Sequence, residues 1–160
     1  MKEHPSAIRL ATPADLPEVA SVMKLSFLEY ELLYTREAFL ATTPEPNQLA
    51  IRMEEGPLWV VEHGSSIVGT VAAVRRGNDL YIRGMAVLPT ARGLRLGQLL
   101  LEQADEFARA EHCGQLVLST TPFLHRAIRL YEGAGFSRTD EGSHELFGTP
   151  LFTMIKNLEK

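Results

Sequence analysis

The segment at residues 85–100 constrains the fold more than any other part of the chain. It reads Met-Ala-Val-Leu-Pro-Thr-Ala-Arg-Gly-Leu-Arg-Leu-Gly-Gln-Leu-Leu, which is typical of an apolar strand that leads through a turn into an amphipathic helix. The first N–H groups of such a helix have no partner within it, and the helix dipole favours negative charge there. The segment therefore predicts a strand, a turn and a helix, with a candidate anion site at the turn.

The turn carries residues that suit a phosphate. Gly93 and Gly97 let the backbone approach a ligand closely, and the guanidinium groups of Arg92 and Arg95 supply charge-assisted hydrogen bonds. An ordinary strand-to-helix connection with solvated arginines explains the same local pattern equally well. The chain lacks the Gly-Lys-Ser/Thr of a Walker A loop and the Gly-x-Gly-x-x-Gly of a dinucleotide fold, so the turn belongs to neither class.

Hydrophobic periodicity predicts a mixed fold around this segment. Strands are expected at residues 7–11, 58–63, 66–75, 79–88, 115–120, 136–139 and 151–155. Helices are expected at residues 16–27, 35–41, 96–108 and 124–134, with a loop at residues 42–47. The three strands between residues 58 and 88 are separated by short turns, as in an antiparallel meander. This order of elements indicates an α+β domain.

Length and composition narrow the class of protein. The 160 residues fit a single domain that covers residues 1–160. Lys and Arg number 16 against 20 Asp and Glu, a net charge of −4, which disfavours a nucleic-acid binder. Cys113 is the only cysteine, so we expect no internal disulfide and a reducing, cytoplasmic setting. We expect no membrane span and no metal site, since the chain has no apolar stretch of about 20 residues and its histidines lack ligand-like spacing.

Two motifs together resemble those of the GCN5-related N-acetyltransferase (GNAT) superfamily. Residues 92–97, Arg-Gly-Leu-Arg-Leu-Gly, resemble the family's acetyl-CoA signature, and Leu-Leu follows at residues 99–100. Residues 127–136, Ala-Ile-Arg-Leu-Tyr-Glu-Gly-Ala-Gly-Phe, resemble the family's segment ending in Leu-Tyr-Glu-x-x-Gly-Phe. The resemblance covers almost the whole chain. It implies an N-acetyltransferase with acetyl-CoA as cosubstrate, built on a mixed, mainly antiparallel sheet flanked by helices.

The resemblance also implies which residues bind acetyl-CoA. In the family the pyrophosphate lies on backbone amides of the turn, and the pantetheine arm runs beside the preceding strand where two strands splay apart. The corresponding residues here are Met85, Ala86 and Val87 in the strand and Arg92, Gly93, Leu94, Arg95, Leu96, Gly97 and Gln98 in the turn. The family usually has glycine where this chain has Arg95, so the assignment requires suitable backbone dihedrals there. Gly84, inside the strand, marks either a bulge or tight packing.

The resemblance implies Tyr131 as the acid that protonates the leaving thiolate, although a tyrosine on a helix also packs into cores. Acetyl transfer needs that proton and a neutral amine. The base is open, because relatives often have a glutamate on the strand before the turn, whereas residues 80–88 contain no carboxylate. A water relay is the provisional choice. Glu29, Glu31, Tyr34 and His125 are candidates to act through it, each of which also fits a solvated or structural role.

The acceptor pocket is expected beside residues 27–47 and 143–149, because these regions flank the acceptor in relatives. Alternation along the strand places Tyr81 and Arg83 on the same face as Met85, toward the substrate. Nearby acidic residues either attract a cationic amine or belong to the solvated surface: Glu29, Glu31, Glu141 and Glu145. A small amine or an amino acid is favoured over a protein N-terminus, because no recognition domain is appended.

Other functions stay open at this point. A non-catalytic acetyl-CoA-binding module would keep the turn but lack a working acid and base, and an acetyltransferase could act on a protein or peptide amine instead. A nucleic-acid binder that uses the arginines is disfavoured by the net charge. The sequence leaves open the acceptor, the base, the preferred acyl length and the oligomeric state, a homodimer included.

Overall fold

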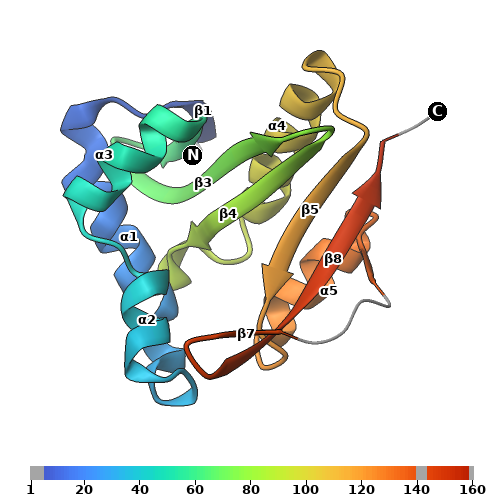
Figure 1. Cartoon of the computed structure of the whole chain (residues 1–160). Helices are drawn as coiled ribbons and strands as arrows, with labels where there is room; N and C mark the ends of the chain where they lie inside the picture. The colour runs from blue at the N-terminus through green and yellow to red at the C-terminus, as the bar shows by residue number, and fades with distance from the viewer. Residues whose placement is uncertain (1–5, 140–143, 159–160) are drawn as a thin grey trace.

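The described part of the chain forms one mixed sheet with helices on both faces (Figure 1). The computed structural model describes residues 6–139 and 144–158. The strands are β1 (Ser6–Leu10), β2 (Leu58–His63), β3 (Ser66–Arg76), β4 (Asp79–Val87), β5 (Gln115–Thr120), β6 (Ser137–Arg138), β7 (His144–Leu146) and β8 (Thr149–Asn157). The α-helices are α1 (Leu16–Phe27), α2 (Arg36–Thr42), α3 (Pro46–Glu55), α4 (Leu96–Ala110) and α5 (His125–Gly133). The short 3-10 helices are η1 (Pro13–Asp15), η2 (Leu28–Leu33) and η3 (Pro89–Ala91).

The strands pair in the order β1-β2-β3-β4-β5-β8-β6, with β7 beside β8. All these pairs are antiparallel except β4 with β5. The parallel pairing of β4 and β5 ends at Tyr81 and Val117, and beyond these residues the two strands diverge (Figure 1). The predicted α+β fold with a mainly antiparallel sheet is confirmed. The divergence gives the splay that the family resemblance implies.

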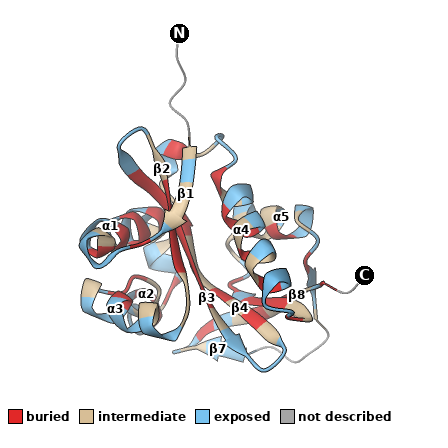
Figure 2. Cartoon of the chain, turned by 90° about the horizontal axis from the view of Figure 1, so that it is seen from above, coloured by how far each residue is buried: buried red, intermediate tan, exposed pale blue. Residues whose placement is uncertain are grey.

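The two faces of the sheet are covered by different helices (Figure 2). On one face α1 and α3 bury Val19 and Leu49 against Val60 of β2. On the other face α4 buries Leu100 against Val71 of β3. Successive residues of a strand point to opposite faces, so the continuous apolar runs of β2 and β3 supply both cores. Each fully buried aliphatic side chain of this kind contributes roughly 1.5–3 kcal/mol.

A β-bulge at Gly84 shifts the alternation of β4. Residues 70–72 of β3 pair with residues 83–86 of β4, so β4 has one residue more than β3 at this point. Gly84 has φ 68°, in the left-handed region that glycine tolerates. Before the bulge, Arg83 forms an ion pair with α3, whereas after it Met85 packs against the core beneath α4. The expectation that Arg83 and Met85 share a face is therefore wrong, because the extra residue reverses the alternation.

Helix α3 lies partly where the sequence predicts a loop. Pro46 begins this helix, so the loop predicted at residues 42–47 is reduced to residues 43–45. A capping box explains the start, because the backbone N–H of Glu45 donates to Gln48 Oε1 at 2.8 Å and proline suits the first helical position. Leu49 is the only residue of the helix that is fully buried, so its apolar stripe is too short to recognise by periodicity.

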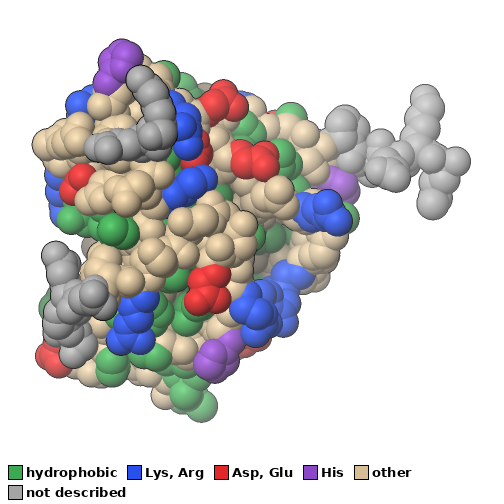
Figure 3. Space-filling model, turned by 90° about the vertical axis from the view of Figure 1, so that its right-hand side faces the viewer, with side chains coloured by type: hydrophobic (Ala, Val, Ile, Leu, Met, Phe, Trp, Pro, Cys, Tyr) green, Lys and Arg blue, Asp and Glu red, His purple; other side chains and the backbone are tan. Residues whose placement is uncertain are grey.

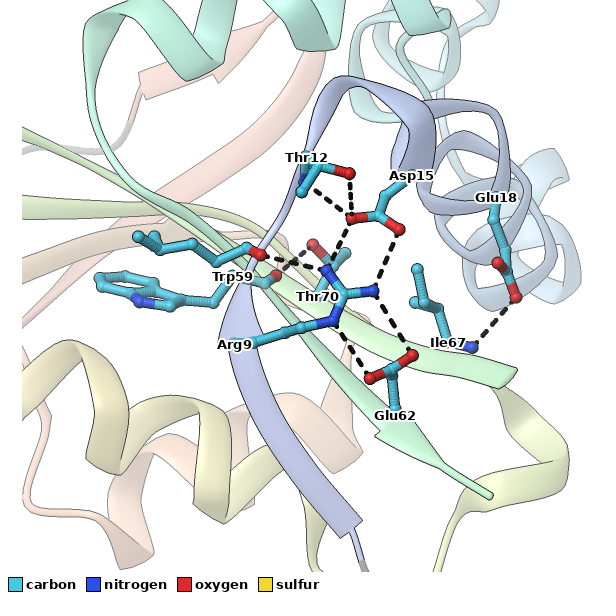
Figure 4. Close-up of polar contacts among 9 residues, drawn as sticks. Arg9, Thr12, Asp15, Glu18, Trp59, Glu62, Ile67 and Thr70 are labelled. Atoms are coloured by element: carbon cyan, nitrogen blue, oxygen red, sulfur yellow. Dashed lines mark hydrogen bonds and ion pairs between the residues drawn. The ribbon is translucent and has the colours of Figure 1, made fainter. Parts of the chain in front are cut away.

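An ion-pair network fastens β1 to the chain that leads into α1 (Figure 4). Arg9 Nη1 lies 2.7 Å from Asp15 Oδ2, and Arg9 Nε lies 3.1 Å from Glu62 Oε1 on β2. The backbone N–H of Thr12 also donates to Asp15 Oδ2, at 2.7 Å. Hydrogen bonds from Arg9 and Thr12 hold the pKa of the Asp15 carboxyl well below its usual range. The network fixes the direction in which α1 leaves the sheet.

The face that contains β8 and α5 has a mixed charge pattern. Figure 3 shows its Lys and Arg side chains in small groups, separated by acidic and uncharged side chains. Nucleic-acid binders instead gather such groups into a patch or stripe. Among the helices of the described residues, none has the length and apolar character that a bilayer crossing requires.

Candidate active site

A cavity of about 680 Å³ lies between the diverging strands, the turn before α4 and the helices on both faces. This volume is within the range of small-molecule and cofactor sites. The predicted cofactor residues that line it are Met85, Ala86, Val87, Arg92, Gly93, Arg95, Leu96, Gly97 and Gln98. Leu94 is not among the described lining residues, and its side chain is 46% exposed. The predicted acid Tyr131 lines the same cavity, so the structure brings these candidates together.

The turn before α4 presents a run of unpartnered backbone donors. The N–H groups of residues 93–98 make no hydrogen bond within the described part of the chain, and the helical ladder begins with Leu99 N–H, which donates to the Arg95 carbonyl at 3.2 Å. The amide of Arg92 differs, because it donates to the Pro89 carbonyl at 3.3 Å. Together with the helix dipole, the free amides make this turn a candidate anion site. The turn therefore has the free backbone donors that an anion site needs. Arg92 is the exception, because its own N–H is already hydrogen-bonded.

Arg95 adopts the backbone conformation of the glycine that it replaces. It is the N-cap residue of α4, with φ 61° and ψ 29°. A residue with a Cβ atom pays about 1–2 kcal/mol for this left-handed conformation. The sequence analysis requires that Arg95 adopt backbone dihedrals suited to the family's glycine. Arg95 does so, with local strain. Such strain is most often found at functional sites.

Helix α5 approaches the turn closely. A Cβ atom on Gly97 would lie 2.6 Å from Cδ2 of Leu130, so only glycine leaves room for the Leu130 side chain as it is placed. Leu130 precedes Tyr131 in α5. The packing of these two helices therefore sets the separation between the free amides and Tyr131.

Tyr131 is 8% exposed and packs at 6.0 Å from the ring of Phe136, both in the core beneath α4. Its hydroxyl has no hydrogen-bond partner within the described part of the chain. Burial, with a smaller effect from Tyr34, raises the pKa of Tyr131 to about 12. The phenol therefore keeps its proton at neutral pH, as a proton donor must.

Of the four candidates for a base, only Tyr34 is among the described residues that line the cavity. Glu29 forms an ion pair with Arg92, and burial raises the pKa of Tyr34, which lines the cavity. Glu31 and His125 are not among the described lining residues. No carboxylate of the described residues lines the cavity at all. Glu145, one of the acidic residues expected near the acceptor, does not line the cavity. Glu141 lies outside the described residues, as does Ser143 at the start of the 143–149 segment.

Sequence reasoning missed Arg52 and Arg76 on the α3 side of the cavity, whereas it expected Tyr81 and Arg83 on the substrate side. Arg52 of α3 and Arg76 of β3 line it together with Tyr81 and Arg83 of β4. Arg76 lies over the Tyr81 ring, with its guanidinium carbon 4.9 Å from the ring centroid. Arg52 is 31 positions before Arg83 in the chain, on a helix that periodicity does not predict, so no local motif joins them. Only the packing of α3 on the sheet brings these cations together.

The sequence model of the Acetyltransferase (GNAT) family matches residues 20–136. The chain belongs to this family. The uncharacterized N-acetyltransferase YjgM of Escherichia coli is 32% identical over 139 residues, which are 83% of each protein. The N-acetylaspartate synthetase of Xenopus tropicalis is 31% identical over 104 residues, or 62% of this chain, which spans only 38% of that relative. The PaiA N-acetyltransferase of Thermoplasma acidophilum, solved with coenzyme A, has the same fold, with a TM-score of 0.82, 16% identity, and coverage of 96% of this chain and 99% of that one.

Membership of the GNAT family makes the chain an acetyltransferase that uses acetyl-CoA. The residues present suit that cosubstrate, because free amides and two arginines face the cavity at the turn, and residues of β4 beyond Tyr81, where its pairing to β5 has ended, line the same cavity. No group of three or more His, Cys, Asp or Glu side chains among residues 6–139 and 144–158 is arranged to hold a metal ion.

Proposed function

We propose that this GNAT acetyltransferase moves the acetyl group of acetyl-CoA to the primary amine of a small molecule or an amino acid, by direct attack within a ternary complex. The observation that carries the proposal is a single cavity shared by the unpartnered amides of residues 93–98, the splayed strands and Tyr131. The N-acetylaspartate synthetase relative supports an amino-acid acceptor, because its name describes an N-acetylated amino acid as product.

The proposed binding of acetyl-CoA divides between the turn and β4. The amides of residues 93–98 hold the pyrophosphate, and the guanidinium groups of Arg92 and Arg95 add charge-assisted hydrogen bonds. The edge of β4 at Met85, Ala86 and Val87 has no pairing to β5, so its backbone groups are available to the amide groups of the pantetheine arm. A ligand held by backbone on two elements lies in a defined orientation, which lowers the entropy cost of the reaction.

The proposed reaction has one bond formed and one broken. The amine nitrogen forms a bond to the thioester carbonyl carbon, the C–S bond breaks, and its electron pair leaves on sulfur. A backbone N–H near Met85 stabilises the charge on the carbonyl oxygen. The Tyr131 hydroxyl gives its proton to the thiolate, and the nitrogen loses a proton to solvent. The raised pKa of Tyr131, about 12 against about 8.5 for a thiol, makes the phenol the weaker acid, so this proton transfer is uphill and the phenolate regains its proton from solvent.

A water relay is proposed as the base. Residues 80–88 contain no carboxylate, and none of the described lining residues is a carboxylate or a histidine. Glu29 does not line the cavity, and its carboxylate forms an ion pair with Arg92. Water in the cavity then carries the proton from the amine to bulk solvent.

The test is thiol release from acetyl-CoA across a panel of amines, amino acids and peptides, measured beside the dissociation constant for acetyl-CoA. The proposal predicts thiol release that depends on a small amine and that matches the amount of N-acetylated product. Tight acetyl-CoA binding with no transfer to any acceptor would instead identify a non-catalytic binding module. Preferential transfer to peptides would identify a protein acetyltransferase.

A further inference from the structure

The charges that line the cavity have one sign. The charged lining residues are Arg52, Arg76, Arg83, Arg92, Arg95 and Arg126, and the described lining residues include no Asp, Glu, Lys or His. Arg92 and Arg95 belong to the turn before α4. Arg52 and Arg83 lie on the other face of the sheet, beside α3, where the bulge at Gly84 is located. A cavity of this kind repels a polycationic acceptor and attracts an anionic one.

An unsatisfied donor points to a ligand in this cavity. Within the described part of the chain, Arg83 Nε is buried without a hydrogen-bond partner, and Arg83 lines the cavity. An unpartnered buried polar atom costs about 1–3 kcal/mol, so such atoms are rare in folded proteins unless a ligand or water completes them. Arg83 uses Nη2 for Glu55 of α3, which leaves Nε for another acceptor.

Arg52 is the second unsatisfied cation. Its side chain makes no hydrogen bond and no ion pair within the described residues, and its Nη1 lies 2.9 Å from the position of a Cβ atom on Gly84. Burial and the charge of Arg83 lower the pKa of Arg52, while the carboxylate of Glu55 opposes that effect. Glu55 pairs with Arg83 and lies in the field of Arg52 and Arg76, so three guanidinium groups face one carboxylate, a local charge of 3 − 1 = +2. A substrate carboxylate would offset part of this charge and supply the missing acceptors.

We infer that the acceptor is a small amine that also carries a carboxylate, as an amino acid does, and that Arg52 and Arg83 bind this carboxylate. The inference rests on the proposed function and defines its substrate class. Gly84, against which Arg52 lies, directly precedes Met85, whose backbone is the proposed contact of the thioester. A carboxylate held at Gly84 therefore brings an amine a few bonds away within reach of the acetyl group.

The structure also assigns a competing role to Glu55. Its carboxylate occupies Arg83, and the ion pair lowers the pKa of Glu55, so it stays charged at neutral pH. Glu55 holds Arg83 in place when no substrate is bound, and it competes with the substrate carboxylate for the same guanidinium. Removal of this competitor should strengthen acceptor binding, which is the opposite of the effect of removing an arginine.

The experiment compares each amino acid with its carboxamide and with its decarboxylated amine, by thiol release in the full-length enzyme. The wild type should favour the amino acid in kcat/KM by about 10- to 100-fold, the range for hydrogen bonds to a charged group. Arg52→Gln and Arg83→Gln should raise KM for the amino acid by a similar factor, with KM for acetyl-CoA within twofold of wild type, and should abolish the preference over the carboxamide. Arg52→Lys, which keeps the charge and the packing of α3, should lose less.

Two further variants complete the design. Glu55→Gln should lower KM for the amino acid, a change that loss of a merely structural ion pair would not produce. Arg109→Gln, on α4 and paired with Asp105 outside the cavity, should leave all constants unchanged. Equal transfer to amino acids and to their decarboxylated amines would overturn the inference while leaving the proposed function intact. Absence of transfer to every amine would overturn both.

Discussion

The Cδ2 atom of Leu130 occupies the space beside Gly97, 2.6 Å from where a Cβ atom on that glycine would lie. The first turn of α4 and the middle of α5 are therefore in direct contact, without an intervening side chain from α4. Since the residues around Gly97 carry the free amides and Leu130 adjoins Tyr131, this contact sets the distance between the cosubstrate turn and the proposed acid. Glycine at residue 97 leaves room for the Leu130 side chain in this position, and an added Cβ would have to displace that side chain.

Gly97→Ala should lower kcat/KM by about 10-fold, because displacement of α5 by a fraction of an ångström misplaces Tyr131 relative to the thioester. The double variant Gly97→Ala with Leu130→Ala should recover part of the loss, since it removes the colliding atoms. Steady-state kinetics of the three variants test this coupling. Additive losses in the double variant would contradict it.

Arg95 offers a matched pair of substitutions. Arg95→Gly and Arg95→Ala both remove the guanidinium, but only alanine keeps the strain of φ 61°. The glycine variant should therefore be more stable than the alanine variant by about 1 kcal/mol, as measured by urea unfolding. Both should bind acetyl-CoA about equally more weakly than wild type, because each loses one charge-assisted contact. Equal stability of the two variants would show that the turn relaxes when the arginine is replaced.

Tyr131→Phe should lower kcat by about 100-fold or more, the usual range for loss of a general acid, and leave the dissociation constant for acetyl-CoA within about twofold. The free energy of unfolding should change by less than about 1 kcal/mol, because the hydroxyl has no hydrogen-bond partner in the described protein. Unchanged turnover in this variant would rule out the acid role.

The pH dependence follows from the direction of the Tyr131 shift. Its pKa is raised to about 12, so the phenol is protonated throughout the range below that value. The rate should therefore rise with pH as the acceptor amine loses its proton, and it should show no fall between pH 8 and about pH 10 that depends on Tyr131. Measurement of kcat from pH 6 to about pH 10 checks this, and an alkaline fall that is absent from Tyr131→Phe would contradict it.

Asp15→Asn should destabilise the fold by about 1–3 kcal/mol at pH 7, because it removes charged hydrogen bonds from Arg9 and Thr12. The pKa of Asp15 is lowered in the folded protein, so its contribution is present above the unfolded value of about 3.9 and is lost as the pH falls below it. The difference in unfolding free energy between variant and wild type should accordingly shrink below about pH 4. A difference that does not depend on pH would contradict this assignment.

Periodicity and turn chemistry predict most of the fold. The strand, turn and helix at residues 85–100 are found as β4, η3 and α4, and the three predicted strands from residue 58 form the antiparallel meander β2, β3 and β4. Periodicity does not predict helix α3, because Leu49 is its only fully buried residue and the helix has no repeating apolar face. The sequence signals that mark it are local, namely Pro46 after Glu45 and the matching Gln48.

The site is predictable only where its residues are neighbours in the chain. The turn and the tyrosine motif are contiguous, so sequence alone selects candidates that line one cavity. Alternation failed at Arg83 and Met85 because the effect of the Gly84 bulge depends on register with β3. The arginines of the acceptor side belong to different elements, and their proximity arises from tertiary packing of α3. Proximity in sequence to the acceptor segments also does not place an acidic residue in the cavity. Glu29, for example, pairs with Arg92 and does not line the cavity.

The most direct test of the account is the mass spectrum of the products formed from acetyl-CoA with a labelled acetyl group and a panel of amino acids. We expect an amino acid that gains one labelled acetyl group on its amine, with an equal amount of free coenzyme A, and much less product in Tyr131→Phe. Acetyl-CoA that binds to the protein but stays intact with every acceptor would contradict it.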